Sequence, residues 1–319
     1  MSQRRIPLID LSHYTRGTPQ ERNRFVKTYG DALKEFGFVS LSNHGVDQQL
    51  IRKTYADVAR LFALPDPAKQ RYHVEGGAGQ RGYTGRLQEH AKNRTVGDLK
   101  EFWHVGRELP AGHAHAAKYG PNLWPSEVAT FKESSLALFN QLDSAAAQML
   151  QALADYFGVG RDTFSDMAQD GNSVLRLIHY PPLKELFVPG GVRAAEHEDI
   201  NLITLLCEGT SSGLEILTRA GEWLPVDTLA GQIVVDSGDM LSRVTNNVIP
   251  ATTHRVVNPK EADLERYSLP FFVHPFPECV LQPLPITETP ENPARYPPIT
   301  ADAFLRQRLE EIGLLKPSA

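Results

Sequence analysis

The residues best suited to chemistry lie together in the segment Ala195-Glu196-His197-Glu198-Asp199. On a β-strand, side chains alternate between the two faces, so His197 and Asp199 would point the same way, about 7 Å apart, and Glu198 the other way. Two ligands on one face can share a metal ion. The pair alone is weak support for a site, because His73-Val74-Glu75 repeats the spacing in a loop-like stretch of the same chain.

A third candidate ligand, His254, lies in the segment 252–259, whose Asn-Pro end is typical of a strand followed by a turn. The next strand is predicted to begin near Arg266. A hairpin centred close to Lys260 would place Arg266 and Ser268 opposite His254 or one step from it, on the same face. A His and an Arg share a face by chance about half the time, so this register supports a common site without establishing it.

The combination of residue types favours iron over zinc. Two imidazoles and one carboxylate on an octahedral metal leave three adjacent positions open, which is the ligand set of mononuclear iron(II) sites that activate O2. Zinc with a bound water, for hydrolysis, is the alternative. Zinc gives no reason for Arg266-Tyr267-Ser268, whereas a guanidinium beside a hydroxyl suits a carboxylate, such as the one at the far end of 2-oxoglutarate.

The elements that must position these residues are predicted to be helices first and strands later. Three helices are predicted in the first half: one from Thr18-Pro19 to Gly37, one ending before Pro65, and one from near Pro125 to Gly158. The glycine-rich segment 75–85 is predicted to be a mobile loop. After Gly171, antiparallel strands are predicted at 174–180, 200–207, 214–217, 232–235 and 268–273, with no further helix before the one at 300–313.

Composition sets limits on the class of protein. The chain has 319 residues, of which 41% are hydrophobic and 22% charged, with a formal net charge of -5, as in an ordinary soluble protein. Basic residues do not gather into a stripe, so no nucleic-acid partner is expected. The apolar runs are of strand length, so no membrane span is expected. Two cysteines, Cys207 and Cys279, are too few for a disulfide framework and indicate a cytoplasmic location.

Taken in order along the chain, these motifs resemble the isopenicillin N synthase-like family of iron(II)- and 2-oxoglutarate-dependent oxygenases. The resemblance covers nearly the whole chain. The segments that carry it are Ile6-Pro7-Leu8-Ile9-Asp10-Leu11, Gly37-Phe38-Val39, Asn43-His44-Gly45-Val46, Leu177-Ile178-His179-Tyr180-Pro181-Pro182, His197-Glu198-Asp199, Gly238-Asp239-Met240-Leu241, Thr245-Asn246, His254-Arg255-Val256 and Arg266-Tyr267-Ser268-Leu269-Pro270-Phe271-Phe272.

The resemblance implies an α+β fold with a mainly β core, in which a distorted double-stranded β-helix, or jelly roll, is flanked by N-terminal and C-terminal helices. It implies a single catalytic unit over 1–319, with an N-terminal helical region at 5–120, an oxygenase core at 172–276 and a closing helix at 300–313. It makes His197, Asp199 and His254 the Fe(II) ligands. Arg266 and Ser268 would hold the distal carboxylate of 2-oxoglutarate, and Tyr180 would lie near the co-substrate or substrate.

The implied reaction is oxidation of a small organic molecule by O2, by hydroxylation, desaturation or cyclisation, with release of succinate and CO2. An iron oxidase of the isopenicillin N synthase type, which uses no 2-oxoglutarate, is the first alternative, since that enzyme keeps an Arg-x-Ser pair for its substrate. A zinc hydrolase and a non-catalytic binding module are more remote. Ile178 stands where the flavonoid-oxidising branch often has Asn, so that substrate class is in doubt. The substrate and the oligomeric state are not predicted.

Other chemically capable residues are given structural roles. Hydrogen-bonding roles are predicted for His44, His179 and His274, which have no ligand partner at a useful spacing. The polar stretch that holds His104, His113 and His115 is predicted to be exposed to solvent. The segment 77–82 matches a dinucleotide fingerprint, but no buried strand precedes it and no helix follows, so nucleotide binding is rejected. Gly238-Asp239 is predicted to form a turn.

Overall fold

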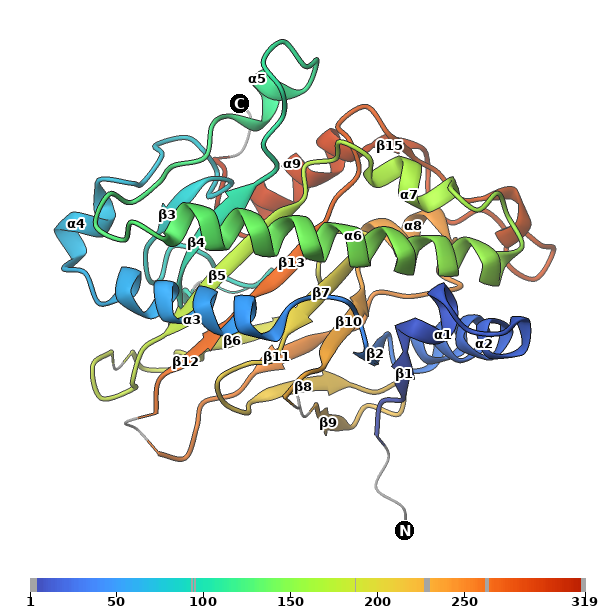
Figure 1. The fold of residues 1–319 in the computed structure, drawn as a ribbon, viewed down its shortest axis with the longest axis horizontal. Helices are drawn as coiled ribbons and strands as arrows, with labels where there is room; N and C mark the ends of the chain where they lie inside the picture. Colours follow the sequence, from blue (N-terminus) through green and yellow to red (C-terminus); the bar gives the residue numbers. More distant parts are fainter. Residues whose placement is uncertain are drawn as a thin grey trace.

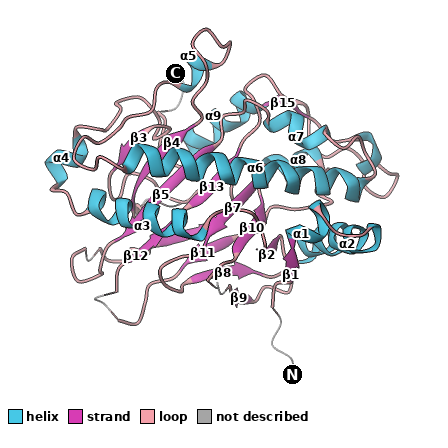
Figure 2. Ribbon diagram, in the orientation of Figure 1, coloured by secondary structure: helices cyan, strands magenta, loops and turns pink. Residues whose placement is uncertain are grey.

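The computed structural model describes residues 5–92, 94, 96–186, 188–226, 230–261 and 264–316. Within them, a nine-stranded sheet in the order β1-β2-β10-β7-β13-β5-β4-β3, with β12 beside β5, faces a four-stranded sheet in the order β6-β11-β8-β9. Helices lie on the outer side of the larger sheet (Figures 1 and 2), where the long helix α6 contacts β4, β5, β7 and β13. The core is therefore rich in sheet, with helices around it.

The helices are α1 (Leu11–Thr15), α2 (Pro19–Glu35), α3 (Gln48–Phe62), α4 (Asp66–Gln70), α5 (Ala116–Tyr119), α6 (Phe131–Phe157), α7 (Thr163–Ala168), α8 (Asp239–Val244) and α9 (Ala301–Glu311). The strands of the larger sheet are β1 (Leu8–Asp10), β2 (Phe38–Ser42), β3 (Gly82–Thr84), β4 (Glu101–Gly106), β5 (Val174–Tyr180), β7 (Ile203–Cys207), β10 (Ile233–Ser237), β12 (Arg266–Ser268) and β13 (Pro270–Val273). The smaller sheet has β6 (Ala194–His197), β8 (Leu214–Leu217), β9 (Trp223–Pro225) and β11 (His254–Val256), and β14 (Val280–Leu281) pairs with β15 (Ile299–Thr300).

Local signals placed the main helices correctly. The Thr18 side chain accepts a hydrogen bond from the Glu21 amide, and the Glu21 side chain accepts one from the Thr18 amide, which forms a capping box with Pro19 in the first turn. Helix α6 begins at Phe131, six residues after the predicted start, because residues 125–131 form consecutive turns instead. It ends as predicted at Gly158, whose φ of 66° suits glycine.

Several predictions about the strands were wrong. The segment 75–85 is not all loop, since Gly82–Thr84 forms β3 and pairs with β4. The strands after Gly171 pair antiparallel as predicted, although β1 and β2, earlier in the chain, are parallel. The helix α8, which was not predicted, lies between these strands and the final helix. The predicted hairpin near Lys260 does not form. Strand β11 pairs with β6 on one side and β8 on the other, so neither edge is open to β12, which pairs with β5 in the larger sheet.

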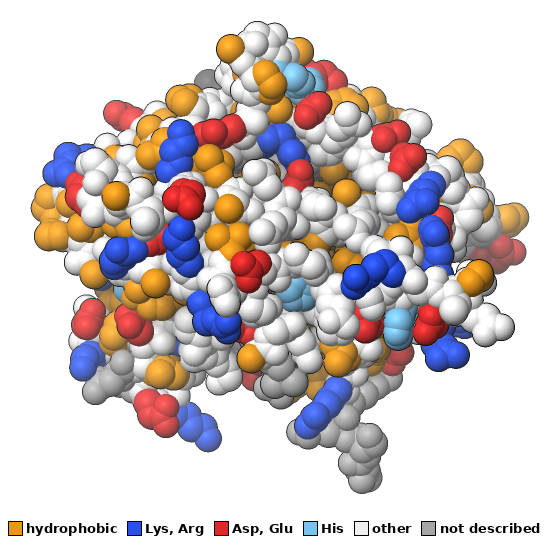
Figure 3. All heavy atoms as spheres, in the orientation of Figure 1, with side chains coloured by type: hydrophobic (Ala, Val, Ile, Leu, Met, Phe, Trp, Pro, Cys, Tyr) orange, Lys and Arg blue, Asp and Glu red, His pale blue; other side chains and the backbone are white. Residues whose placement is uncertain are grey.

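The surface carries both signs of charge. On the face seen in Figure 3, lysine and arginine side chains alternate with aspartate and glutamate. Among the described helices, none combines the length and the apolar character that crossing a membrane requires.

A buried carboxylate joins the strands next to the site. Glu101 on β4 is 1% exposed and accepts hydrogen bonds from Lys69 Nζ at 2.7 Å and the Tyr83 hydroxyl at 2.5 Å, and its other oxygen contacts His179 Nδ1 at 2.8 Å. Burial opposes its ionisation, but these three bonds lower the pKa of Glu101 to about 2. The bonds hold β4 and the neighbouring helix against β5, whose last residue is Tyr180.

We expect Glu101→Gln to lower the free energy of unfolding at pH 7 by about 3 kcal/mol, given a lowering of the pKa from 4.5 to about 2. Because the pKa in the folded state is below the usual value, this stabilisation is complete above about pH 4.5 and is lost as the pH falls toward 2. Urea unfolding from pH 7 to pH 3 should therefore show a shrinking difference between the variant and the wild type. A difference that stays constant with pH would contradict this, and Glu133→Gln, at a solvent-exposed ion pair, should change little.

Candidate active site

Three side chains that could bind a metal ion meet between the two sheets. His197 is the last residue of β6 and lies directly opposite His254 on β11. Asp199 follows two residues after β6 ends, so it reaches the site from a loop and not from the strand that was predicted. Asp199 Oδ1 is 3.9 Å from His197 Nε2 and 3.7 Å from His254 Nε2. One ligand atom from each residue lies within 4.8 Å of the other two.

Hydrogen bonds to backbone carbonyls orient both imidazoles so that their Nε2 atoms face Asp199. His197 Nδ1 lies 2.7 Å from the Ala195 carbonyl and His254 Nδ1 lies 3.1 Å from the Thr252 carbonyl. A carbonyl can only accept, so both Nδ1 atoms carry the proton and both Nε2 lone pairs remain available to a metal. Burial, and then the neighbouring His197, lower the pKa of His254 to about 4, which keeps this imidazole neutral.

The carboxylate has its own support, which the sequence did not reveal. The Thr204 hydroxyl donates to Asp199 Oδ2, and the Asn201 amide donates to the Thr204 hydroxyl at 2.9 Å. This leaves Oδ1 facing the two imidazoles. Asp236 on β10 is fully buried nearby, and burial together with the charge of Asp199 raises its pKa well above the usual value. No motif marks Thr204 or Asp236, since Thr204 is a single polar residue within the apolar strand β7, and Asp236 is followed only by Ser237 at the end of the otherwise apolar strand β10.

Arg266, Ser268 and Tyr180 line the same cavity as the three metal-site residues. The cavity has a volume of about 60 Å³, and its remaining walls are apolar side chains from both sheets together with Lys100, Arg176, Thr204 and Asp236. Arg266 pairs with Tyr180 in the register of β12 and β5. All six predicted site residues are therefore brought together, although Arg266 and Ser268 come from the sheet opposite His254 and not from a hairpin with it.

The state of Arg266 fits a bound carboxylate. Its side chain is 2% exposed, and its guanidinium lies 5.1 Å from the centre of the Tyr180 ring. Nε donates to the Ser211 carbonyl at 3.1 Å, but the buried Nη1 has no hydrogen-bond partner among the described residues. A buried cation with an unused N–H group is costly unless an anion pairs with it. A carboxylate at this end and two imidazoles with a carboxylate at the other fit 2-oxoglutarate and iron.

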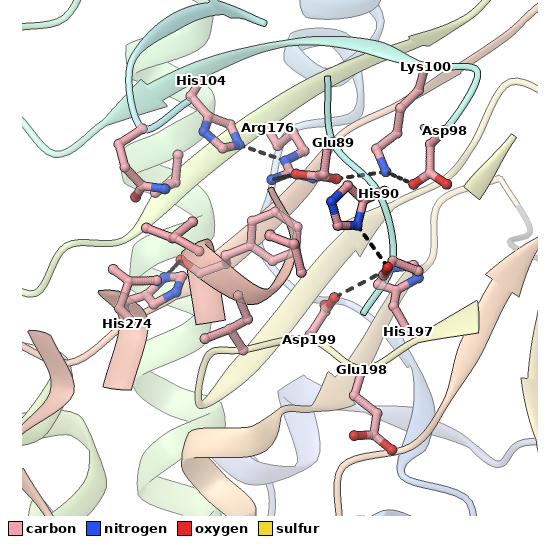
Figure 4. A pocket seen from close by; sticks show the side chains of 18 residues that line it. Glu89, His90, Asp98, Lys100, His104, Arg176, His197, Glu198, Asp199 and His274 are labelled. Atoms are coloured by element: carbon pink, nitrogen blue, oxygen red, sulfur yellow. Dashed lines mark hydrogen bonds and ion pairs between the residues drawn. The ribbon is translucent and has the colours of Figure 1, made fainter. Parts of the chain in front are cut away.

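A second cavity, of about 100 Å³, adjoins the first and shares Lys100, Arg176, His197, Asp199 and Phe272 with it. Figure 4 shows charged and polar side chains along one side, from Asp98 through Lys100, Glu89 and Arg176 to His104. Apolar side chains of α9, Leu305 and Leu309, form part of the opposite wall. In the same view Glu198 points away from the cavity, as the alternation of side chains predicted, and it accepts a hydrogen bond from Thr253 at 3.0 Å.

The remaining histidines follow the sequence prediction only in part, since His113 and His115, which were predicted to be exposed, are partly buried. His44, His179 and His274 contact the Gly231 carbonyl, Glu101 and the Phe272 carbonyl, respectively. The prediction that His104 is exposed was wrong: it is 2% exposed, because β4 lies between β3 and β5 within the sheet. Gly238-Asp239 is not a simple turn but the start of α8, and the Asp239 carboxylate pairs with Arg308 of α9 at 3.1 Å.

Two family descriptions match this chain. Residues 6–127 match the N-terminal region of the non-haem dioxygenases described from morphine synthesis. Residues 171–275 match the 2OG-Fe(II) oxygenase superfamily, and this segment contains all six predicted site residues. The second match includes strands of both sheets around the site, so fold and site together define an oxygenase that depends on a metal.

Related proteins and solved structures are similar to this chain along nearly its full length. The 2-oxoglutarate-dependent dioxygenase tropC of Talaromyces stipitatus is 30% identical over 88% of this chain and 89% of its own. A structure of a protein from Caulobacter crescentus, assigned to the 2OG-Fe(II) oxygenase family, is 43% identical with a TM-score of 0.85, covering 96% of this chain and 98% of that one. A full-length Neurospora crassa protein, solved in complex with alpha-KG and thymine, is 28% identical with a TM-score of 0.84, covering 95% and 96%.

The chain belongs to the 2-oxoglutarate- and Fe(II)-dependent oxygenases of the isopenicillin N synthase-like type. It is an oxidoreductase whose cofactor is Fe(II) and whose co-substrates are 2-oxoglutarate and O2.

Proposed function

We propose that His197, Asp199 and His254 bind the Fe(II) of this oxygenase and that Arg266 and Ser268 hold the distal carboxylate of 2-oxoglutarate beside Tyr180. The observation that carries this assignment is that all six side chains line one cavity between the two sheets. The Nε2 atoms of both histidines and Oδ1 of Asp199 are the atoms left free for the metal. Arg266 supplies an unpaired cationic N–H group at the far end of this cavity.

In this proposal, bound Fe(II) couples the oxidation of a small organic molecule by O2 to the conversion of 2-oxoglutarate into succinate and CO2. The protein's residues supply orientation. Thr204 fixes the Asp199 carboxylate, the Ala195 and Thr252 carbonyls fix the imidazoles, and Arg266 sets the depth to which 2-oxoglutarate enters. Apolar side chains such as Leu206, Leu214 and Val256 exclude water from the co-substrate cavity. Hydroxylation, desaturation and cyclisation are all compatible with this arrangement.

We further propose that the two facing sheets form a distorted double-stranded β-helix, or jelly roll, and that the chain is a single catalytic unit over 1–319. An N-terminal helical region at 5–120, an oxygenase core at 172–276 and a closing helix at 300–313 agree closely with the family matches at 6–127 and 171–275 and with α9. A cytoplasmic location is proposed from two cysteines that are both buried and unpaired.

The proposed substrate is a small molecule, as is the thymine in the complex of the Neurospora crassa protein. The oxidase alternative, which needs no 2-oxoglutarate, has less support because the named relatives depend on that co-substrate. The zinc alternative leaves the buried Arg266 without a role.

Anaerobic titration tests the site without knowledge of the substrate. Adding Fe(II) and then 2-oxoglutarate to the metal-free protein should produce the weak visible charge-transfer band of a keto acid chelated to iron. Succinate in place of 2-oxoglutarate should give no band, since it has the distal carboxylate but no keto group. Iron binding without a band would favour the oxidase, and failure to bind Fe(II) would favour zinc.

A further inference from the structure

The residues that line the cavity of about 100 Å³ beside His197 and Asp199 limit the kind of substrate that can bind there. Under the proposed function, on which this inference rests, 2-oxoglutarate occupies the cavity of about 60 Å³, which adjoins the cavity of about 100 Å³ at His197 and Asp199. The second cavity is then where a substrate would present a C–H bond to the metal (Figure 4). Its charges and its unused hydrogen-bonding atoms can therefore be compared with those of possible substrates.

The charges along the polar wall cancel. Lys100 Nζ lies 2.7 Å from Glu89 and 2.5 Å from Asp98, and Arg176 binds both oxygens of Glu89 at 3.0 Å. Two cations are thus paired with two carboxylates, and all four side chains are at least half-buried. The remaining nitrogen of the Arg176 guanidinium, Nε, donates to His104 Nε2 at 2.6 Å.

Arg176 is also fixed in place. Its guanidinium lies 4.1 Å from the centre of the Phe102 ring and 5.1 Å from that of Phe272. It cannot turn toward a new anion without breaking these contacts and its paired bonds to Glu89. The wall therefore contains two cations but offers no unpaired positive charge to a substrate.

Two of the polar atoms left over, on His274 and Glu89, are acceptors. Burial lowers the pKa of His274 to about 4, so its imidazole is neutral at pH 7. Its Nδ1 faces the Phe272 carbonyl at 3.4 Å and must carry the proton, which leaves the Nε2 lone pair without a partner among the described residues. Glu89 Oε2 receives only the bond from Arg176 in that set, so it retains one accepting position.

We propose that the substrate of this enzyme is a small uncharged molecule that donates hydrogen bonds through N–H or O–H groups, and that the second cavity rejects carboxylates. Such donors would satisfy His274 Nε2 and Glu89 Oε2, while the apolar part of the molecule would contact Leu305, Leu309 and Phe272. A carboxylate has no donor for these acceptors, and it would lose its hydration beside Glu89 and Asp98 with no free cation to replace the water.

Benzamide and benzoate test this class, because they have nearly the same shape but differ in charge and in their ability to donate. Anaerobic calorimetry of the wild-type holoenzyme, loaded with Fe(II) and 2-oxoglutarate, should show benzamide binding at least about tenfold more tightly than benzoate. Benzoate binding as tightly as benzamide, or no measurable binding of benzamide at millimolar concentration, would overturn the proposal.

Two variants test separately the effect of the negative charge of Glu89 and the effect of the hydrogen-bond acceptor of His274. Glu89→Gln leaves Lys100 and Arg176 with a single carboxylate partner, so the tenfold preference for benzamide should disappear or reverse. His274→Leu changes no charge and removes one acceptor, so benzamide should bind about tenfold more weakly and benzoate should be unaffected. An unchanged preference in both variants would contradict the assignment, and His274→Leu remains informative if Glu89→Gln does not fold.

A further pair of variants tests whether benzamide binds in this cavity. Leu309→Trp on α9 should fill the cavity and abolish benzamide binding, whereas Ala303→Trp, at an exposed position of the same helix, should leave it unchanged. Benzamide binding that survives Leu309→Trp would place the probe elsewhere and overturn the inference. The charge-transfer titration reports the metal and 2-oxoglutarate assignment separately, so a band together with no preference for benzamide would reject the substrate class alone.

Discussion

Substituting His254 or Asp199 with Ala is expected to reduce 2-oxoglutarate turnover by at least about 1,000-fold, which corresponds to about 4 kcal/mol in the activation free energy. His254 is buried on β11 between β6 and β8, and its Nε2 faces Asp199 Oδ1 at 3.7 Å. With one of three ligands removed, the remaining two have no neighbour positioned to replace it among the described residues. Oxygen consumption and succinate formation measure the loss, and the charge-transfer band should disappear in parallel.

The matched control is His73→Ala, which removes a histidine from the His-x-acid pattern that the chain repeats by chance. His73 is exposed, and its ring Nδ1 lies 3.1 Å from the Tyr83 carbonyl, away from the three metal-site residues. Its variant should retain both turnover and the charge-transfer band. Full turnover in His254→Ala or Asp199→Ala would reject the proposed metal site, whatever the behaviour of the control.

The metal residues were predictable because the sequence motif is local, although part of the reasoning was incorrect. His197 does sit at the end of a strand, but Asp199 reaches the site from the loop that follows it. His254 and Arg266 were predicted to meet on one face of a hairpin. His254 and Arg266 meet because the two sheets that hold them face each other. Residues 252–268 alone cannot show this, since strand periodicity predicts the face on which a side chain lies but not the strand with which its own strand pairs.

The surroundings of the site could not be predicted for the same reason. Arg176 and Glu89 are 87 residues apart, and Glu89 comes from a stretch without regular structure. The Thr204 hydroxyl donates a hydrogen bond to Asp199 from β7, whose other residues are apolar. The helices were predicted more accurately than the site's hydrogen bonds, because capping residues such as Thr18 and Gly158 act on neighbours only a few residues away. Hydrogen bonds between distant segments of the chain form only after folding.

The second large effect is expected at the co-substrate. Arg266→Gln should raise the KM for 2-oxoglutarate by about 100-fold or more, because removing one partner of a buried charge pair costs about 2–5 kcal/mol in typical cases. Arg266 is 2% exposed, and its Nη1 has no partner among the described residues, so the carboxylate of 2-oxoglutarate would be its counter-charge. Turnover at saturating 2-oxoglutarate should fall much less than turnover at low concentration, since the variant keeps all three proposed metal ligands.

Arg255→Gln makes the same change of charge beside the same site and serves as the control. Arg255 follows His254 on β11 but points to the other face, where it pairs with Glu215 at 2.8 Å and lies 3.8 Å from the centre of the Trp223 ring. Its loss should leave the KM for 2-oxoglutarate unchanged. If Arg266→Gln also left this KM unchanged while Fe(II) still bound, the guanidinium would have to contact the substrate instead, as in the oxidase alternative. A raised KM in Arg266→Gln alone would assign the buried cation to 2-oxoglutarate, since both variants lose one guanidinium and only one of the two faces the co-substrate cavity.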